Sequence, residues 1–194
     1  MKAVSAAVMA GGKSRRMGVD KAWLDVGDGR PIIQCVIDVL REVADDVLIV
    51  ANDERYAALG PRVVPDRWPG CGALGGIGTG IGAATHDRVL VVACDMPFLR
   101  ATVLRHLVEQ ADGVDAVVPR IAGEHETLHA LYTKACLAPI ERALAAGKMR
   151  VISFFDEVRI RALDEHDLRA LDPDLRCFTN VNTPQELAAA RARR

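Results

Sequence analysis

The sequence has no pair of cysteines at metal-binding or redox spacing. Its five cysteines are spread between positions 35 and 177, and none forms a C-x-x-C pair with another. An odd number of widely spaced cysteines favours free thiols over a disulfide framework or a zinc ribbon. We therefore expect a protein of a reducing compartment, and we assign it to the cytoplasm.

Long apolar runs and an excess of either charge are also missing. No apolar stretch reaches the roughly 18 residues that a membrane span requires, and glycine at position 11 comes too early for the apolar region of a secretion signal. The net charge is −1, so no overall field favours nucleic acid or an anionic membrane. We expect neither as a partner, and any phosphate binding must come from local clusters of cations.

No repeat, low-complexity segment or linker divides the 194 residues, so we expect a single domain over 1–194. Apolar β-branched runs alternate with amphipathic stretches at intervals of about 20 to 30 residues, which predicts an α/β fold with a mostly parallel sheet covered on both faces. The predicted strands are 4–8, 47–50, 62–64, 88–94, 115–119 and 128–132. Six helices are predicted. The first begins at Pro31, the second ends at 59, the third ends at 84, the next two cover 102–111 and 139–146, and the last runs from Pro184 into 191.

The most informative stretch is the loop at residues 9–21, M-A-G-G-K-S-R-R-M-G-V-D-K, which follows the first predicted strand. It contains three glycines and four cations in thirteen residues. Glycine lets backbone N–H groups close around an anion, and arginine and lysine supply charge to several phosphate oxygens. The loop does not fit the P-loop pattern G-x-x-x-x-G-K-[ST]. A different nucleoside triphosphate cradle is the functional interpretation, and a basic surface loop is the alternative.

A second glycine-rich segment contains a literal G-x-G-x-x-G at residues 70–75, with Asp95 twenty residues beyond it. A dinucleotide-binding fingerprint needs a strand that runs directly into its first glycine. Pro65 and Pro69 interrupt the chain at that point, and Asp95 ends the very next strand. The dinucleotide-binding interpretation is therefore rejected.

Polar residues follow several predicted strands, where ligands of open α/β sheets bind. Asp95 closes the wholly apolar strand 88–94, and a carboxylate there suits Mg²⁺ that bridges substrate phosphates. The alternative is that Asp95 only caps the following loop. Asp66 considered alone is a turn residue after Pro65.

Four segments together resemble one family, the molybdenum cofactor guanylyltransferases. Residues 10–21 match the family's first loop, and residues 70–77, G-C-G-A-L-G-G-I, match its second glycine segment. Residues 94–98, C-D-M-P-F, and 180–187, N-V-N-T-P-Q-E-L, match its two remaining motifs. The first motif is shared by the wider nucleotidyltransferase superfamily, and N-V-N-T-P narrows the resemblance to this family.

The resemblance implies a fold, a reaction and a set of partners. The fold would be a three-layer αβα, Rossmann-like nucleotidyltransferase fold with a mostly parallel twisted sheet. The reaction would transfer GMP from GTP to the terminal phosphate of the molybdenum–molybdopterin cofactor, with Mg²⁺, and release pyrophosphate. Partners would be GTP, the molybdopterin cofactor, and proteins that deliver the pterin or receive the product, such as molybdoenzyme apoproteins or their chaperones.

The resemblance also assigns roles to individual residues. Lys21, Arg15 and Asp95 would be catalytic, and Asp95 would bind Mg²⁺. Asn180 and Asn182 would lie beside the pterin-phosphate acceptor. The residues expected to contact the nucleotide are Met9, Ala10, Gly11, Gly12, Lys21, Asp66 and Asp95.

The sequence departs from the family pattern at two positions. Ala73 replaces a proline of the second glycine segment, which we expect to loosen it. Val50 stands where some members carry an asparagine at the nucleotide, and Asn52 is a weak substitute for it. Contacts to the base are therefore less well defined than contacts to the phosphates.

Three other functions remain as alternatives. Residues 125–129 spell H-E-x-x-H, the signature of zinc hydrolases, but the pattern requires a helix and the residues from Leu128 onward are strand-like. A cytidylyl- or sugar-1-phosphate nucleotidyltransferase would share the fold and the first loop. A non-catalytic nucleotide-binding module would not need the carboxylate of Asp95.

Overall fold

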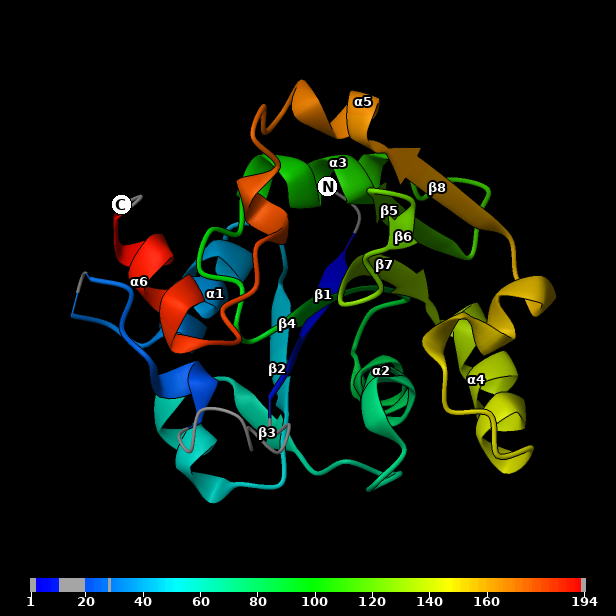
Figure 1. Cartoon of the computed structure of the whole chain (residues 1–194). Helices are drawn as coiled ribbons and strands as arrows, with labels where there is room; N and C mark the ends of the chain where they lie inside the picture. Colours follow the sequence, from blue (N-terminus) through cyan, green and yellow to red (C-terminus); the bar gives the residue numbers. More distant parts are fainter. Residues whose placement is uncertain (1–2, 11–19, 28, 193–194) are drawn as a thin grey trace.

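The computed structural model describes residues 3–10, 20–27 and 29–192. Within them an eight-stranded sheet has the order β3-β2-β1-β4-β7-β5-β6, with β8 paired to β5 off this path (Figure 1). The strands are β1 (Val4–Met9), β2 (Asp46–Val50), β3 (Arg62–Val64), β4 (Arg88–Ala93), β5 (Ala116–Ile121), β6 (Glu124–His125), β7 (His129–Thr133) and β8 (Ile160–Asp164). The predicted α/β class is confirmed.

The strand directions are mixed around a parallel centre. β1 is parallel to both β2 and β4, and β2 is parallel to β3. β7 enters between β4 and β5 and is antiparallel to both, whereas β8 is parallel to β5. Consequently β1, β2, β3 and β4 all end at one edge of the sheet, as the mostly parallel prediction requires.

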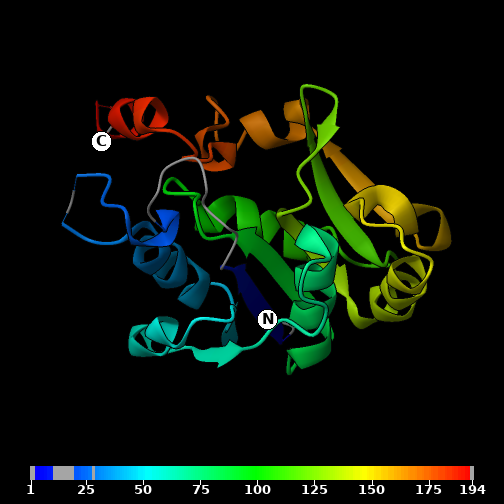
Figure 2. The same ribbon diagram turned by 60° about the horizontal axis from the view of Figure 1, so that its bottom comes forward.

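Helices cover both faces of the sheet, as the three-layer expectation requires (Figures 1 and 2). α2 and α4 lie on one face, and α1, α3, α5 and α6 pack against the other. The helices are α1 (Ile32–Arg41), α2 (Gly72–Ala83), α3 (Ala101–Glu109), α4 (Leu137–Ala145), α5 (Glu165–Arg169) and α6 (Pro184–Ala192). The 3₁₀ turns are η1 (Lys21–Trp23), η2 (Glu54–Leu59), η3 (Lys134–Cys136), η4 (Val151–Glu157) and η5 (Arg176–Phe178).

The two cores follow from the alternation of side chains along each strand. In β1, Ala6 and Val8 point into the core with α1 and α3, while Ala7 points into the core with α2 and α4. All three are fully buried, as expected of a strand covered on both faces. This sandwich fixes the position of the loop that follows β1.

The glycines of α2 allow the helix to lie very close to β1. A Cβ at Gly80 would stand 2.9 Å from the Cβ of Ala7 and 3.2 Å from Cε of Met9. A Cβ at Gly75 would stand 2.9 Å from the carbonyl oxygen of Trp68. The two 2.9 Å distances are shorter than real side-chain contacts. Glycine is therefore required at 80 for the packing of α2 on β1, and at 75 for the close approach of the segment before α2.

The capping box predicted for the last helix is confirmed. Thr183 precedes α6, and its hydroxyl accepts a hydrogen bond from the backbone N–H of Glu186 at 3.1 Å. The carboxylate of Glu186 accepts in return from the N–H of Thr183, also at 3.1 Å. Pro184 is the first helical residue, as predicted.

No helix among the described residues has both the length and the apolar character needed to cross a membrane.

Candidate active site

The carboxyl ends of three strands are joined by backbone hydrogen bonds just before the first loop. Ala10 donates its N–H to the carbonyl of Val50 at the end of β2, at 3.0 Å. Cys94 donates to the carbonyl of Met9, at 3.1 Å, where β4 ends. Met9 and Ala10 therefore lie at the edge of the sheet where Asp95 leaves β4. Because its N–H is used by Val50, Ala10 can offer a ligand only its carbonyl and its methyl group.

The far end of the first loop is held by Asp20. Its carboxylate caps η1 by accepting from the N–H of Ala22 at 3.2 Å, and it accepts from the hydroxyl of Tyr56 at 2.7 Å. Tyr56 is fully buried and stacks on Trp23, with ring centroids 5.6 Å apart. The sequence did not predict this contact, because a single tyrosine in η2 forms no motif or repeating pattern with its neighbours. The support fixes the backbone of Lys21, the first residue of η1.

Lys21, Asp95 and Asn182 meet, although they are far apart in the sequence. The ammonium nitrogen of Lys21 lies 2.5 Å from Oδ1 of Asn182 and 3.5 Å from Oδ2 of Asp95. The side chains of Lys21 and Asp95 are only 20% and 15% exposed. Three of the residues predicted from sequence therefore form one partly buried cluster at the carboxyl edge.

The segment before α6 reaches this edge through its backbone. Val181 donates its N–H to the carbonyl of Asp95 at 3.0 Å. The carboxylate of Glu186 accepts from the N–H of Asn182 at 2.5 Å, in addition to its bond with Thr183. The capping box thus fixes the residues on which Asn180 and Asn182 are carried.

The electrostatics around Asp95 favour a cation. Burial raises the pKa of the Asp95 carboxyl above its ordinary value, and the neighbouring Lys21 ammonium only partly offsets this effect. Oδ1 of Asp95 and Oδ1 of Asn180 are buried and have no hydrogen-bond partner among the described residues. A hard carboxylate oxygen without a partner fits Mg²⁺, which uses one or two carboxylates and completes its shell with phosphate oxygens and water. The described residues contain no cluster of three or more His, Cys, Asp or Glu side chains that would hold a metal without substrate.

Asp66 follows β3 and is used in a turn. Its Oδ1 accepts from the N–H of Trp68 at 3.0 Å and from the hydroxyl of Thr79 at 3.1 Å. Its own N–H donates to Oδ1 of Asn52 at 2.9 Å. This geometry agrees with the turn interpretation of Asp66, and its contact with a nucleotide stays a prediction.

Three residues assigned from the first loop, Gly11, Gly12 and Arg15, lie outside the described residues. The two departures from the family pattern do lie within them. Ala73 is in the first turn of α2, which forms without the proline. Val50 is the last residue of β2 and is 3% exposed, packed in the core with α2. Val50 therefore cannot supply a polar contact to a base.

The H-E-x-x-H segment is two strands joined by a turn. His125 ends β6 and His129 begins β7, and the expected strand-like character after Leu128 is confirmed. His129 is fully buried against Phe178 with ring centroids 4.4 Å apart, whereas His125 meets Phe155 edge-on. Burial lowers the pKa of His129 to about 4. The helix on which a zinc hydrolase would carry both ligands is therefore absent from this described segment.

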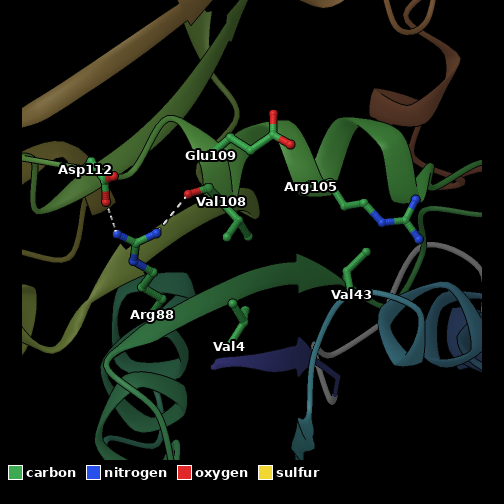
Figure 3. A pocket seen from close by; sticks show the side chains of 7 residues that line it. All are labelled: Val4, Val43, Arg88, Arg105, Val108, Glu109 and Asp112. Atoms are coloured by element: carbon green, nitrogen blue, oxygen red, sulfur yellow. Dashed lines mark hydrogen bonds and ion pairs between the residues drawn. The ribbon is translucent and has the colours of Figure 1, made fainter. Parts of the chain in front are cut away.

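A separate cavity of about 360 Å³ lies at the opposite edge of the sheet, where β1 and β4 begin (Figure 3). Arg88 on its wall donates to the carboxylate of Asp112, and to the carbonyl of Val108 at 3.0 Å. The remaining wall is formed mainly by Val4, Val43 and the α3 side chains. Arg88 is already engaged by these two acceptors, and Arg105 donates to the carbonyl and the carboxylate of Glu42, so we assign no part of the candidate site to this cavity.

A glycine-rich sequence after the first strand of a mostly parallel sheet, with a lysine and a carboxylate that meet where the strands end, is typical of α/β enzymes that bind nucleotides. The family profile described as "MobA-like NTP transferase domain" matches residues 6–162. The chain therefore belongs to the MobA-like NTP transferase family, and it is a nucleotidyltransferase.

The relatives extend the similarity over the whole chain. It is 44% identical to the "Probable molybdenum cofactor guanylyltransferase" of Pelotomaculum thermopropionicum, over 95% of this chain and 90% of the relative. It is 38% identical to the "Molybdenum cofactor guanylyltransferase" of Desulfosudis oleivorans, over 99% and 96%. The crystal structure of molybdopterin-guanine dinucleotide biosynthesis protein A from Archaeoglobus fulgidus superposes with a TM-score of 0.83, at 27% identity and 97% coverage of both chains.

Proposed function

We propose that the protein transfers GMP from GTP to the terminal phosphate of the molybdenum–molybdopterin cofactor, forming the guanine dinucleotide cofactor and pyrophosphate. The observation that carries the proposal is the convergence of Lys21, Asp95 and Asn182 at one edge of the sheet. These residues come from three motifs of the family, and the names of the relatives indicate the substrates. The partner proteins would be those that deliver the pterin or take up the product.

In the proposed reaction an oxygen of the acceptor's terminal phosphate attacks the α-phosphorus of GTP, and the bond to the β-phosphate breaks. A phosphate is largely ionised at neutral pH, so the attack needs little help from a general base. The protein's contribution is alignment and neutralisation of charge. Lys21 and Arg15 would bind the transferred and leaving phosphates, and Asn180 and Asn182 would orient the acceptor.

Asp95 is the residue that would hold Mg²⁺, because its second oxygen is buried without a partner among the described residues. Mg²⁺ would neutralise phosphate oxygens and fix their geometry. Met9, Ala10, Gly11, Gly12 and Asp66 complete the proposed nucleotide site.

The test is to incubate the protein with Mg²⁺, molybdopterin and each of the four nucleoside triphosphates in turn, and to measure pyrophosphate. We expect pyrophosphate to be released with GTP and not with the other three nucleotides. Release with CTP alone would make the protein a cytidylyltransferase, and tight GTP binding without release would indicate a non-catalytic module.

The matching variant is Asp95→Ala, which we expect to lower turnover at least about 100-fold, as for loss of one electrostatic stabiliser of a transition state. Asp156→Ala, which removes an exposed carboxylate on η4, is the control and should retain turnover. Near-normal turnover of Asp95→Ala would remove its proposed role.

A further inference from the structure

Asn182 contacts a residue of the nucleotide half of the site. Its Oδ1 lies 2.5 Å from Nζ of Lys21, a shorter contact than the 3.5 Å between Lys21 and Asp95. A lysine ammonium only donates hydrogen bonds, so the amide must turn its oxygen toward Lys21. An asparagine that only bound the acceptor would not require this contact with Lys21.

The backbone around Asn182 is held more firmly than the side chain of Lys21. Val181 is bonded to the carbonyl of Asp95 at 3.0 Å, and the N–H of Asn182 is bonded to the carboxylate of Glu186 at 2.5 Å. Lys21 carries its charge on a flexible four-carbon chain with many rotamers. Asn182 carries its amide on a much shorter side chain from this bonded backbone, so we infer that the amide orients the ammonium and not the reverse.

The chemistry of an amide suits this role. An amide oxygen orients an ammonium group without cancelling its charge, whereas the carboxylate of Asp95 neutralises it. If Asn182 were absent, Asp95 would be the remaining partner of Lys21 in this cluster. The ammonium would then move toward Asp95. This movement would weaken its attraction to the triphosphate and occupy a carboxylate proposed to hold Mg²⁺.

We propose that Asn182 is a positioning residue for nucleotide binding: its amide oxygen holds the Lys21 ammonium toward the triphosphate and away from Asp95. The inference deepens the function proposed above and rests on the nucleotide lying at Lys21. It differs from that proposal in one respect, because Asn182 then acts on GTP before any acceptor has bound.

The experiment is calorimetric titration of GTP with Mg²⁺ into the full chain, with no acceptor present, for the wild type, Lys21→Ala, Asn182→Ala and the double variant. We expect Lys21→Ala to weaken binding about 10-fold or more, and Asn182→Ala about 5- to 10-fold, as for loss of hydrogen bonds to a charged group. In the Lys21→Ala background, Asn182→Ala should change the affinity less than about 2-fold, because both act through one interaction.

Gln185→Ala is the matched control, since it removes an exposed amide from the first turn of α6, three residues after Asn182, to which no role in the site is assigned. It should leave the affinity for GTP within about 2-fold of the wild type. Asn182→Asp, which keeps the shape of the side chain, should bind GTP at least as weakly as Asn182→Ala. This variant replaces Asn182→Ala in the titration if the alanine variant unfolds at too low a temperature to be measured.

Two results would overturn the inference: wild-type affinity in Asn182→Ala, or an equal loss on adding Asn182→Ala to Lys21→Ala. Wild-type affinity in Lys21→Ala is a different outcome, because it would place the nucleotide elsewhere and refute the proposed function as well.

Discussion

Asp46 is predicted to stabilise the fold in a pH-dependent manner. It begins β2, and its carboxylate accepts from the hydroxyl of Ser5 at 2.7 Å, from the N–H of Thr85 at 2.9 Å and from Arg62 at 3.2 Å. These donors come from β1, from the turn before β4 and from β3. The carboxylate therefore ties together the edge of the sheet opposite the candidate site.

The size of the effect follows from the pKa of Asp46. Burial, the largest single influence, raises this pKa, but the hydrogen bonds from Thr85, Ser5 and Arg62 outweigh it and lower the pKa from 3.8 to about 2. The side chain is only 15% exposed, so solvent screening is modest. A shift of this size corresponds to about 2 kcal/mol of stability. Because the folded pKa is the lower one, this stability is complete above about pH 4 and is lost as the pH falls through 2.

The perturbation is Asp46→Asn, which preserves the shape but removes the charge. We expect urea unfolding at pH 7, followed by circular dichroism, to show a loss of about 2 kcal/mol relative to the wild type. The same titration between pH 5 and pH 2.5 should show the difference shrinking, because only the wild type loses this contribution. Asp156→Asn, at an exposed position, is the control and should change stability by less than about 0.5 kcal/mol.

A constant difference between Asp46→Asn and the wild type across this pH range would refute the reasoning. It would mean that the substitution acts through packing or hydrogen-bond geometry, with no part for the lowered pKa.

Two further predictions concern α2 and α6. Gly80→Ala should destabilise the fold by about 1–3 kcal/mol in urea titrations, because the new methyl group would stand 2.9 Å from the Cβ of Ala7. Gly82→Ala, in the same helix, is the control, because a Cβ there would have its nearest neighbour at 3.4 Å. It should leave the stability of the fold unchanged or raise it by up to about 1 kcal/mol. An equal loss of stability at both positions would rule out the steric explanation. Glu186→Ala should cost about 0.5–2 kcal/mol and increase hydrogen exchange at the N–H of Asn182, and unchanged exchange there would exclude Glu186 as its acceptor.

The strands and the main helices could be predicted because burial on both faces leaves a local pattern. The apolar run of β4 was placed within one residue. The helix predicted to follow Ile77 ends as expected, but α2 already begins at Gly72, because a glycine-rich sequence does not distinguish a loop from a closely packed helix. The direction of β7 could not be predicted, because a period of two residues is the same in parallel and antiparallel strands. β8 was missed because its residues are mostly half-exposed or exposed, so its sequence resembles a surface loop.

The candidate site was predicted in its parts but not in its contacts. The motifs indicated Lys21, Asp95 and Asn182 separately, and the rule that ligands bind at the carboxyl ends of strands placed them at one edge. The hydrogen bond between Lys21 and Asn182 joins residues 161 positions apart, and no local pattern encodes it. The buried Tyr56 that supports Asp20 was missed for the same reason.

The backbone bond between Val181 and Asp95 has a consequence for how the protein is made. The last strand of the sheet ends at Asp164, so every described strand is synthesised before Asn182 leaves the ribosome. At 5–20 residues per second this interval is roughly 1 to 4 s. A nascent chain can therefore begin to pair its strands before Val181 reaches Asp95, and the contact between Lys21 and Asn182 is among the last that the chain forms.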